Sequence, residues 1–277
     1  MKLDNRLAKA INPKETRSRV IRDFEDYEEL YNQQIAELEK AFKEEIERIG
    51  KAQDAFILAD DVEQFNSSKM IAIASATYAS AAKLAYEKLS EQLITNENYI
   101  NDLAASYASR RGGMLVQGIT SQTRSAIRNA VATGLNDGAD ITETTRRIRK
   151  VIGLDDRGVR AVSNLRRNLS QQGVNPAKIS KQVDAYSDKL LNQRAKLIAR
   201  TEMQQAIETA KLDIWKSSGK PVYVQWITDS GPCGKCAPSS GDVTIAGQYF
   251  QTSLGAYESP PLHPNCRCQL HELRYSV

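Results

Sequence analysis

The chain contains no cysteine in its first 232 residues, and all four of its cysteines fall within the last 45. Aromatic residues make up only 6% of the 277 residues, and histidine occurs twice. No apolar run approaches the roughly 18 residues of a membrane-spanning helix, and the start, Met1-Lys-Leu-Asp-Asn-Arg, lacks the apolar stretch of a secretory signal. We therefore expect no membrane association and synthesis in the cytosol, which favours reduced thiols and bound metal over disulfides.

Several signatures of catalysis and of nucleic-acid stacking are also missing. The sequence has no HExxH, no Walker-type loop and no GxSxG elbow. Few aromatic residues interleave with its basic residues, so stacking on single-stranded nucleic acid is not expected. These absences predict a protein that is not an enzyme.

The net charge of +4 conceals an uneven distribution along the chain. Residues 101–200 carry 18 Lys or Arg against 8 Asp or Glu, whereas residues 1–100 carry 14 against 19 and residues 201–277 carry 6 against 7. A basic middle region predicts a surface that meets an acidic partner, either nucleic acid or an acidic protein. The alternative is a solvated helical face with counter-charges nearby. The candidate contact residues are Arg124, Arg128, Arg146, Arg147, Arg149, Lys150, Arg157, Arg160, Arg166 and Arg167.

The first part of the chain is predicted to be helical. Apolar residues between 24 and 49 recur at steps of three and four in an 11-residue repeat, which keeps one stripe on an almost straight helix. Gly50 is expected to end or kink this helix. Ser67-Ser68 can cap an Ala-rich helix over 70–93, and a third helix is predicted over 98–116.

Clear helix starts and stops follow from residue 119 onward. Caps at Thr, Asp and Asn and stops at Gly predict helices over 120–135, 140–152, 155–172, 177–184 and 185–217. After Gly219-Lys-Pro221 the period changes, because residues 222–227 alternate and are β-branched or aromatic. Short strands are expected within 239–250 and 267–273. The predicted fold class is mainly α with a small C-terminal α+β subdomain, divided into an N-terminal helical arm (1–97), a basic helical region (98–220) and a Cys/His subdomain (221–277).

The cysteine cluster has the spacing of a metal site. Cys233-Gly-Lys-Cys236 is followed, after 26 residues, by His263-Pro-Asn-Cys266-Arg-Cys268. In each ligand-x-x-ligand segment a tight turn brings two side chains to one ion, and two such knuckles complete the tetrahedron that Zn²⁺ prefers. On an extended strand Cys266 and Cys268 face the same way, so five candidates compete for four positions. A disulfide pair or unligated thiols are the alternatives, and a thioredoxin-like redox centre does not fit because no βαβ pattern surrounds Cys233.

These motifs, in this order, resemble a known family. Ala199-Arg200-Thr201-Glu202 precedes Trp226-Ile-Thr-Asp229, the first knuckle, a Ser-Gly-Asp turn at 240–242 and the second knuckle. This combination closely resembles the phage head-morphogenesis family, the minor capsid proteins related to the F protein of phage Mu, over about residues 100–270. The chain departs from the family at the turns around Ser230-Gly-Pro and after Cys236, which does not affect the candidate ligands.

The resemblance implies a structural role in a tailed-phage particle. Such proteins enter the procapsid in few copies, lie inside the head near the portal, and affect DNA packaging or delivery. The implied partners are the portal protein, on which the chain would be oligomeric, then capsid or scaffolding protein, and DNA without sequence preference. Before packaging, the chain would be in the host cytoplasm.

The polar segment 200–202 on the last predicted helix has two interpretations. Arg200, Thr201 and Glu202, with Trp226 on the following strand, are expected to form a structural motif that supports the zinc subdomain. Catalysis is the alternative for Arg200 and Glu202, but no base and nucleophile accompany them. Two other functions remain as alternatives: a sequence-independent DNA-binding protein that uses the 101–200 region, and a metal-dependent hydrolase.

Overall fold

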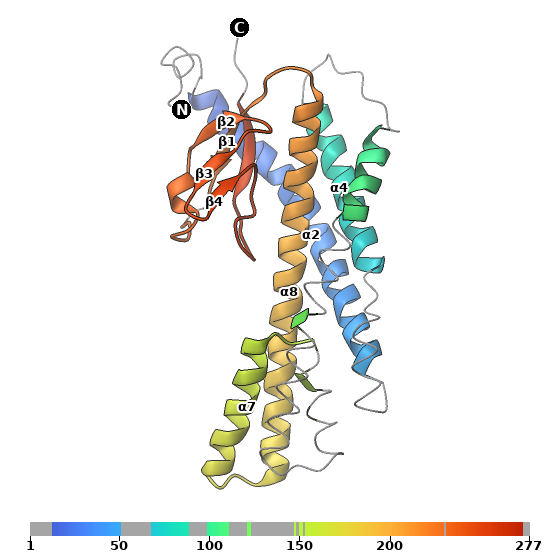
Figure 1. Ribbon diagram of the computed structural model, residues 1–277, viewed down its shortest axis with the longest axis vertical. Coiled ribbons are helices and arrows are strands. Elements are labelled where there is room, and N and C mark those ends of the chain that lie inside the picture. The colour runs from blue at the N-terminus through green and yellow to red at the C-terminus, as the bar shows by residue number, and fades with distance from the viewer. Residues whose placement is uncertain are drawn as a thin grey trace. The chain divides into compact units, whose positions relative to one another are not determined.

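The computed structural model describes residues 13–50, 68–88, 99–110, 121–122, 147, 150–151, 153–229 and 231–273. It divides into two compact units, each assembled from separate stretches of the chain. The first unit comprises Met1–Glu37, Ala72–Ala108 and Leu197–Val277, and the second comprises Leu38–Ile71 and Ser109–Lys196. Helices α2 (Pro13–Gly50), α4 (Ser68–Lys88) and α8 (Pro176–Ser217) contribute residues to both units (Figure 1).

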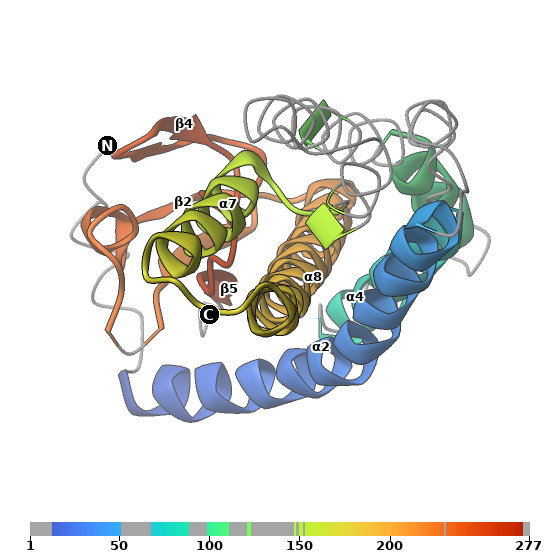
Figure 2. The same cartoon turned by 90° about the horizontal axis from the view of Figure 1, so that it is seen from below.

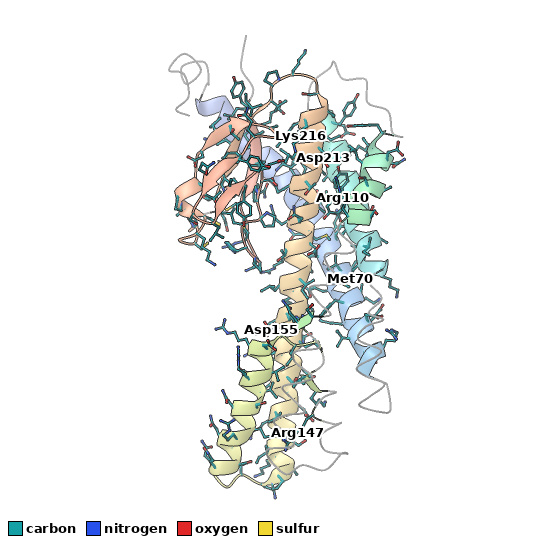
Figure 3. All side chains as sticks on the ribbon, viewed as in Figure 1. Met70, Arg110, Arg147, Asp155, Asp213 and Lys216 are labelled. Carbon is teal, nitrogen blue, oxygen red and sulfur yellow. The ribbon has the colours of Figure 1, made fainter. Side chains whose placement is uncertain are left out.

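Helices of the first unit pack through small and aromatic residues. In α4, the side chains of Ala81, Ala82 and Tyr78 are fully buried, as the Ala-rich pattern predicts for a helix that neighbours approach closely. The Tyr78 ring stacks on Tyr107 of the helical segment 99–110, with ring centroids 4.7 Å apart. The Tyr78 hydroxyl lies 2.6 Å from the carboxylate of Asp213, which is labelled on α8 in Figure 3. These contacts join α4, the 99–110 segment and the end of α8.

Short strands follow α8 within the same unit. Gly219, which has a left-handed φ of +68°, lies in the connection between α8 and β1 (Tyr223–Ile227). A three-stranded antiparallel sheet has the order β2-β1-β5, with β2 at Val243–Ile245 and β5 at Gln269–Leu273. A separate hairpin pairs β3 (Phe250–Thr252) with β4 (Gly255–Tyr257). Figure 1 shows these strands beside the C-terminal half of α8.

The small core of this region lies between the strands and α8. Along β1, Val224 and Trp226 are fully buried and alternate with partly exposed neighbours, which matches the predicted period of two. Trp226 meets Phe250 edge to face, at 5.2 Å between ring centroids. The same apolar cluster contains Trp215 of α8 and three of the four cysteines. Three of the four thiols, those of Cys236, Cys266 and Cys268, therefore belong to this core.

The second unit contains an antiparallel helical hairpin. Helix α7 (Asp156–Gln171) begins at Asp155, whose side chain accepts a hydrogen bond from the Gly158 N–H at 2.8 Å, as expected for an N-cap. Asn175 caps α8 in the same way, through the Ala177 N–H at 2.9 Å. Figures 1 and 2 both show α7 alongside the first part of α8. Gly153, with a φ of +85°, packs against Ile46 so closely that a Cβ there would lie 2.9 Å from the isoleucine.

The predicted fold class, mainly α with a small C-terminal sheet region, is confirmed. One boundary differs, because the stretches 177–184 and 185–217 form a single helix, Pro176–Ser217. Neither glycine nor proline interrupts this stretch after Pro176, so the helix continues. The predicted helices over 120–135 and 140–152 lie mostly outside the described residues. Within the described part of the chain, no helix has the length and apolar character needed to cross a membrane.

Candidate metal centre

The first knuckle is a tight turn that follows β1. The Cys236 and Ala237 N–H groups both donate to the Cys233 carbonyl, at 3.0 and 2.9 Å. The turn continues into a short 3-10 helix, η1 (Ala237–Ser239). This geometry leaves Cys233 exposed and buries Cys236 in the apolar cluster.

The second knuckle leads into β5. Cys266 N–H donates to the His263 carbonyl at 3.1 Å, which closes the turn around Asn265. Asn265 has a φ of +60°, the left-handed conformation that asparagine tolerates better than most residues. Cys266 and Cys268 are both buried. The second knuckle therefore presents one partly exposed imidazole and two buried thiols.

The two knuckles meet, although 26 residues separate them in the sequence. His263 Nε2 lies 3.2 Å from Cys233 Sγ and 3.2 Å from Cys236 Sγ. Cys236 Sγ lies 3.7 Å from Cys266 Sγ. Two groups of possible metal ligands, with all ligand atoms of each group within 4.8 Å of one another, share Cys236: one is Cys233, Cys236 and His263, and the other is Cys236, Cys266 and Cys268.

The orientation of His263 suits metal ligation. Its Nδ1 lies 2.9 Å from the Pro264 carbonyl oxygen, so Nδ1–H donates and Nε2 carries the lone pair that faces the thiols. Metal-binding histidines use the same second hydrogen bond to fix the tautomer and the ring direction. The imidazole is thus aimed at the centre of the cluster.

The thiols have unequal acidities. Hydrogen bonds from the backbone N–H groups of Cys236 and Lys235 lower the pKa of Cys233 to about 7. A hydrogen bond from the Cys268 thiol lowers the pKa of Cys266 to about 5, and donating that bond, together with burial, raises the pKa of Cys268. Burial raises the pKa of Cys236 to about 12.

The imidazole responds to the same surroundings. Burial lowers the pKa of His263, but the Pro264 carbonyl and the negative charge of Cys266 and Cys233 outweigh it, so the pKa is raised. Two of the thiols are therefore readily ionised near neutral pH, and they attract a proton to the histidine or a cation to the cluster.

The residues present fit a zinc ion. At a Zn–S distance of about 2.3 Å, two sulfurs of a tetrahedral site lie about 3.8 Å apart, close to the 3.7 Å between Cys236 and Cys266. Thiolate and imidazole ligands favour zinc over magnesium or calcium. All four cysteines are free. The donor set and its spacing thus suit one four-coordinate ion with a fifth candidate ligand beside it.

Helix α8 holds the second knuckle through its polar face. The Asn265 N–H donates to the Thr201 hydroxyl at 3.1 Å, and Arg200 Nη1 donates to the Asn265 side-chain oxygen at 3.4 Å. Glu202 is buried on α8, and Trp226 is buried beside Cys266 and Cys268. The four residues of the expected structural motif thus lie on α8 and β1, and three of them (Arg200, Thr201 and Trp226) lie near the second knuckle.

The structure describes six of the ten predicted basic residues, and these six differ in exposure. Arg124, Arg128, Arg146 and Arg149 lie outside the described residues. Lys150 pairs with Asp184 at 3.7 Å, while Arg147 (labelled in Figure 3) and Arg166 are partly buried. Among the described basic residues of this set, Arg157, Arg160 and Arg167 are exposed together, on α7. At about 100° per residue they fall within one narrow arc of the helix, opposite the buried Val162.

Sequence reasoning missed three polar residues on α8. These side chains are buried on a face of the helix that also carries apolar residues such as Met203 and Ile207. The three residues are Gln204, Glu208 and Lys211. Lys211 Nζ lies 2.8 Å from Glu208 Oε1, and the lysine faces the rings of Tyr27 and Trp215, 4.8 and 5.6 Å from their centroids. Burial raises the pKa of Glu208, and the nearby lysine only partly offsets it. Their spacing of four and three on a helix with an otherwise apolar face was the signal that could have identified them.

Comparison with known proteins identifies one relationship. The family model described as "Phage Mu protein F like protein" matches residues 125–271, more than half of the chain. The match contains all of α7 and α8 and both knuckles. No curated protein and no solved structure matches the chain.

Proposed function

Since the chain belongs to the family of phage Mu protein F-like proteins, we propose that it is a minor capsid protein for head morphogenesis in a tailed bacteriophage. Its role is structural: it associates with the portal inside the head and assists assembly, DNA packaging or DNA delivery. The family match over residues 125–271 carries this proposal. We assign no catalytic residue to the chain.

The Cys/His cluster supports a structural zinc ion in this role. We assign the four ligands to Cys233, Cys236, His263 and Cys266, because three sulfur–sulfur or nitrogen–sulfur contacts of 3.2 to 3.7 Å connect them. Cys268 is then a neighbouring thiol that hydrogen-bonds to Cys266. A site closed by four protein ligands stabilises a fold and leaves no position for substrate. The ion would hold together short strands that bury little apolar surface of their own.

The three predicted regions are assigned separate tasks. Residues 1–97 dock on the portal or on a neighbouring subunit through the long helix α2, residues 98–220 carry the basic surface, and residues 221–277 form the zinc-stabilised end. The chain would be oligomeric on the portal and would also meet capsid or scaffolding protein. It would lie in the host cytoplasm during assembly and in the virion afterwards.

Sequence-independent DNA binding is the second candidate function. The observation that favours it is the exposed stripe on α7 made by Arg157, Arg160 and Arg167, which have no ion-pair partner among the described residues. Three arginines on one helical face can contact successive phosphates, which gives salt-sensitive binding without base specificity. This activity is compatible with the first proposal, because packaged DNA lies in the same compartment.

Purified particles test the structural proposal. The phage that encodes the chain is grown, and its mature heads and its empty procapsids are analysed by quantitative mass spectrometry. We expect a few copies of the chain per head, and co-purification with portal rings when the two proteins are produced together. Absence of the chain from both kinds of particle would show that it is not a head component.

A further inference from the structure

Two side chains of α8 occupy the open edge of β5. The Gln204 side-chain amide donates to the Cys268 carbonyl at 2.8 Å, and the Glu208 carboxylate accepts from the Leu270 N–H at 2.8 Å. The opposite edge of β5 pairs with β1. Backbone groups of residues two apart point to the same edge of a strand. The Gln204 and Glu208 side chains therefore occupy the hydrogen-bonding positions that a further strand beside β5 would use.

The contact continues into the second knuckle. One turn before Gln204, the Thr201 hydroxyl accepts the Asn265 N–H at 3.1 Å. Asn265 directly precedes Cys266 and has left-handed backbone geometry, so this bond fixes the turn that carries the ligand. Thr201, Gln204 and Glu208 follow one another at steps of three and four. They therefore form one face of α8, which we name the docking face.

Because these polar side chains are buried, their hydrogen bonds favour one arrangement of the backbone over others. Gln204 and Glu208 are 5% and 0% exposed, and they reach backbone groups of Cys268, directly before β5, and of Leu270 within it. Glu208 is also held by Lys211 at 2.8 Å and by Gln204 at 3.4 Å. Buried polar groups of this kind contribute little net stability compared with apolar side chains, but they fix one arrangement of the backbone. The arrangement that they fix is the position of the second knuckle and of β5 against α8.

We propose that the docking face of α8 positions Cys266 and the adjoining strand for the metal, so that metal affinity depends on helix residues that do not touch the ion. Thr201 and Gln204 are positioning residues in this scheme. The inference rests on the structural metal assigned above. Since coupling between two events is reciprocal, the bound metal in turn strengthens the docking of β5 on α8.

Zinc affinity of matched variants of the full chain tests this inference. Thr201→Val removes the bond from the Asn265 N–H and the bond to the Leu197 carbonyl. Gln204→Met removes the bonds to the Cys268 carbonyl and to Glu208, and both substitutions change the side-chain volume little. Thr209→Val and Gln205→Met are the controls, because these residues lie on the same helix and bond to each other at 2.9 Å without touching the knuckle. Affinity is measured by competition with a chromogenic chelator, and Co²⁺ absorption of the saturated protein reports the ligand set.

We expect zinc affinity to fall about 10- to 100-fold in Thr201→Val and Gln204→Met, the range seen when outer partners of metal ligands are removed. The controls should keep wild-type affinity, and all four variants should give the wild-type Co²⁺ spectrum because the ligands are unchanged. Equal affinity in the folded variants and their controls would overturn the positioning role while leaving the metal site intact. A wild-type chain that binds neither ion would overturn the metal site itself. If Gln204→Met fails to fold, Thr201→Val alone decides the outcome.

Discussion

Lys211 and Glu208 form an ion pair on α8 that is almost completely removed from solvent, with 2.8 Å between Nζ and Oε1 and side-chain exposures of 2% and 0%. The lysine also faces two aromatic rings, and the carboxylate bonds to the Leu270 N–H. Breaking such a pair leaves a buried charge without its partner, which is far more costly than losing an exposed pair.

Lys211→Met should therefore destabilise the chain by about 3 kcal/mol at pH 8. Without the lysine, the pKa of Glu208 rises further above the value of 4.5 that it has when unfolded. A raised folded-state pKa means that folding takes up a proton, so the variant regains stability relative to the wild type as the pH falls. Urea unfolding at pH 8 and pH 5.5 measures both effects.

The control for this experiment is Lys216→Met, which breaks the partly exposed pair with Glu258. It should cost under about 1 kcal/mol, with little dependence on pH. If Lys211→Met lowered the free energy of unfolding by the same amount at pH 8 and pH 5.5, the loss of stability would not come from an unpaired charge on Glu208.

Replacing single cysteines should separate ligands from the neighbouring thiol. Cys233→Ser and Cys236→Ser should lower bound zinc from about one ion per chain and loosen the C-terminal strands, while the helices stay folded because the metal holds a local region. Cys268→Ser should keep the zinc. Elemental analysis gives the metal content, and circular dichroism with limited proteolysis locates the loss of structure.

Two outcomes would contradict this assignment. Loss of zinc in Cys268→Ser with retention in Cys233→Ser would move the fourth ligand from Cys233 to Cys268. Equal loss of structure along the whole chain in Cys236→Ser would contradict a metal that acts locally.

In the metal-free chain, Cys233 should be the first cysteine to react with an alkylating reagent. This thiol is exposed and its pKa is about 7, so at pH 8 most of it is thiolate. Cys266 has the lower pKa of about 5, but it is buried and should react more slowly. Iodoacetamide labelling followed by peptide mass spectrometry measures the order, and added zinc should protect Cys233. Labelling of Cys233 that is unaffected by zinc would remove it from the ligand set.

The arginine stripe on α7 should determine any binding to DNA. Replacing Arg157, Arg160 and Arg167 with Gln removes three phosphate contacts, so the slope of log K against log salt should decrease by about 3. Fluorescence anisotropy with a random-sequence duplex measures this slope. The control replaces three exposed residues of the first unit with Gln, which makes the same change in charge without changing α7: Lys83, Lys220 and Lys235. Equal weakening by both triple variants would indicate net charge rather than a defined surface.

Local signals predicted much of the fold. The Asp155 cap, the stop at Gly173 and the alternation along 222–227 each depend on neighbours in sequence, and each appears in the structure. The two knuckles were also readable, because ligand spacing within each turn is local. The pairing of Glu208 with Leu270, 62 residues away, was not predictable, since no local pattern specifies which strand edge a helix covers. The choice of four ligands among five depended on where the knuckles meet, which spacing alone does not give.

The position of β5 between β1 and the docking face has a consequence for synthesis of the protein. Both of its neighbours are translated before it, so their bonding groups remain open until the last strand has left the ribosome. A chain that terminates before residue 269 would expose the edge of β1 and the buried polar residues of α8 together. We therefore expect such incomplete chains to be degraded by proteases faster than chains that contain β5.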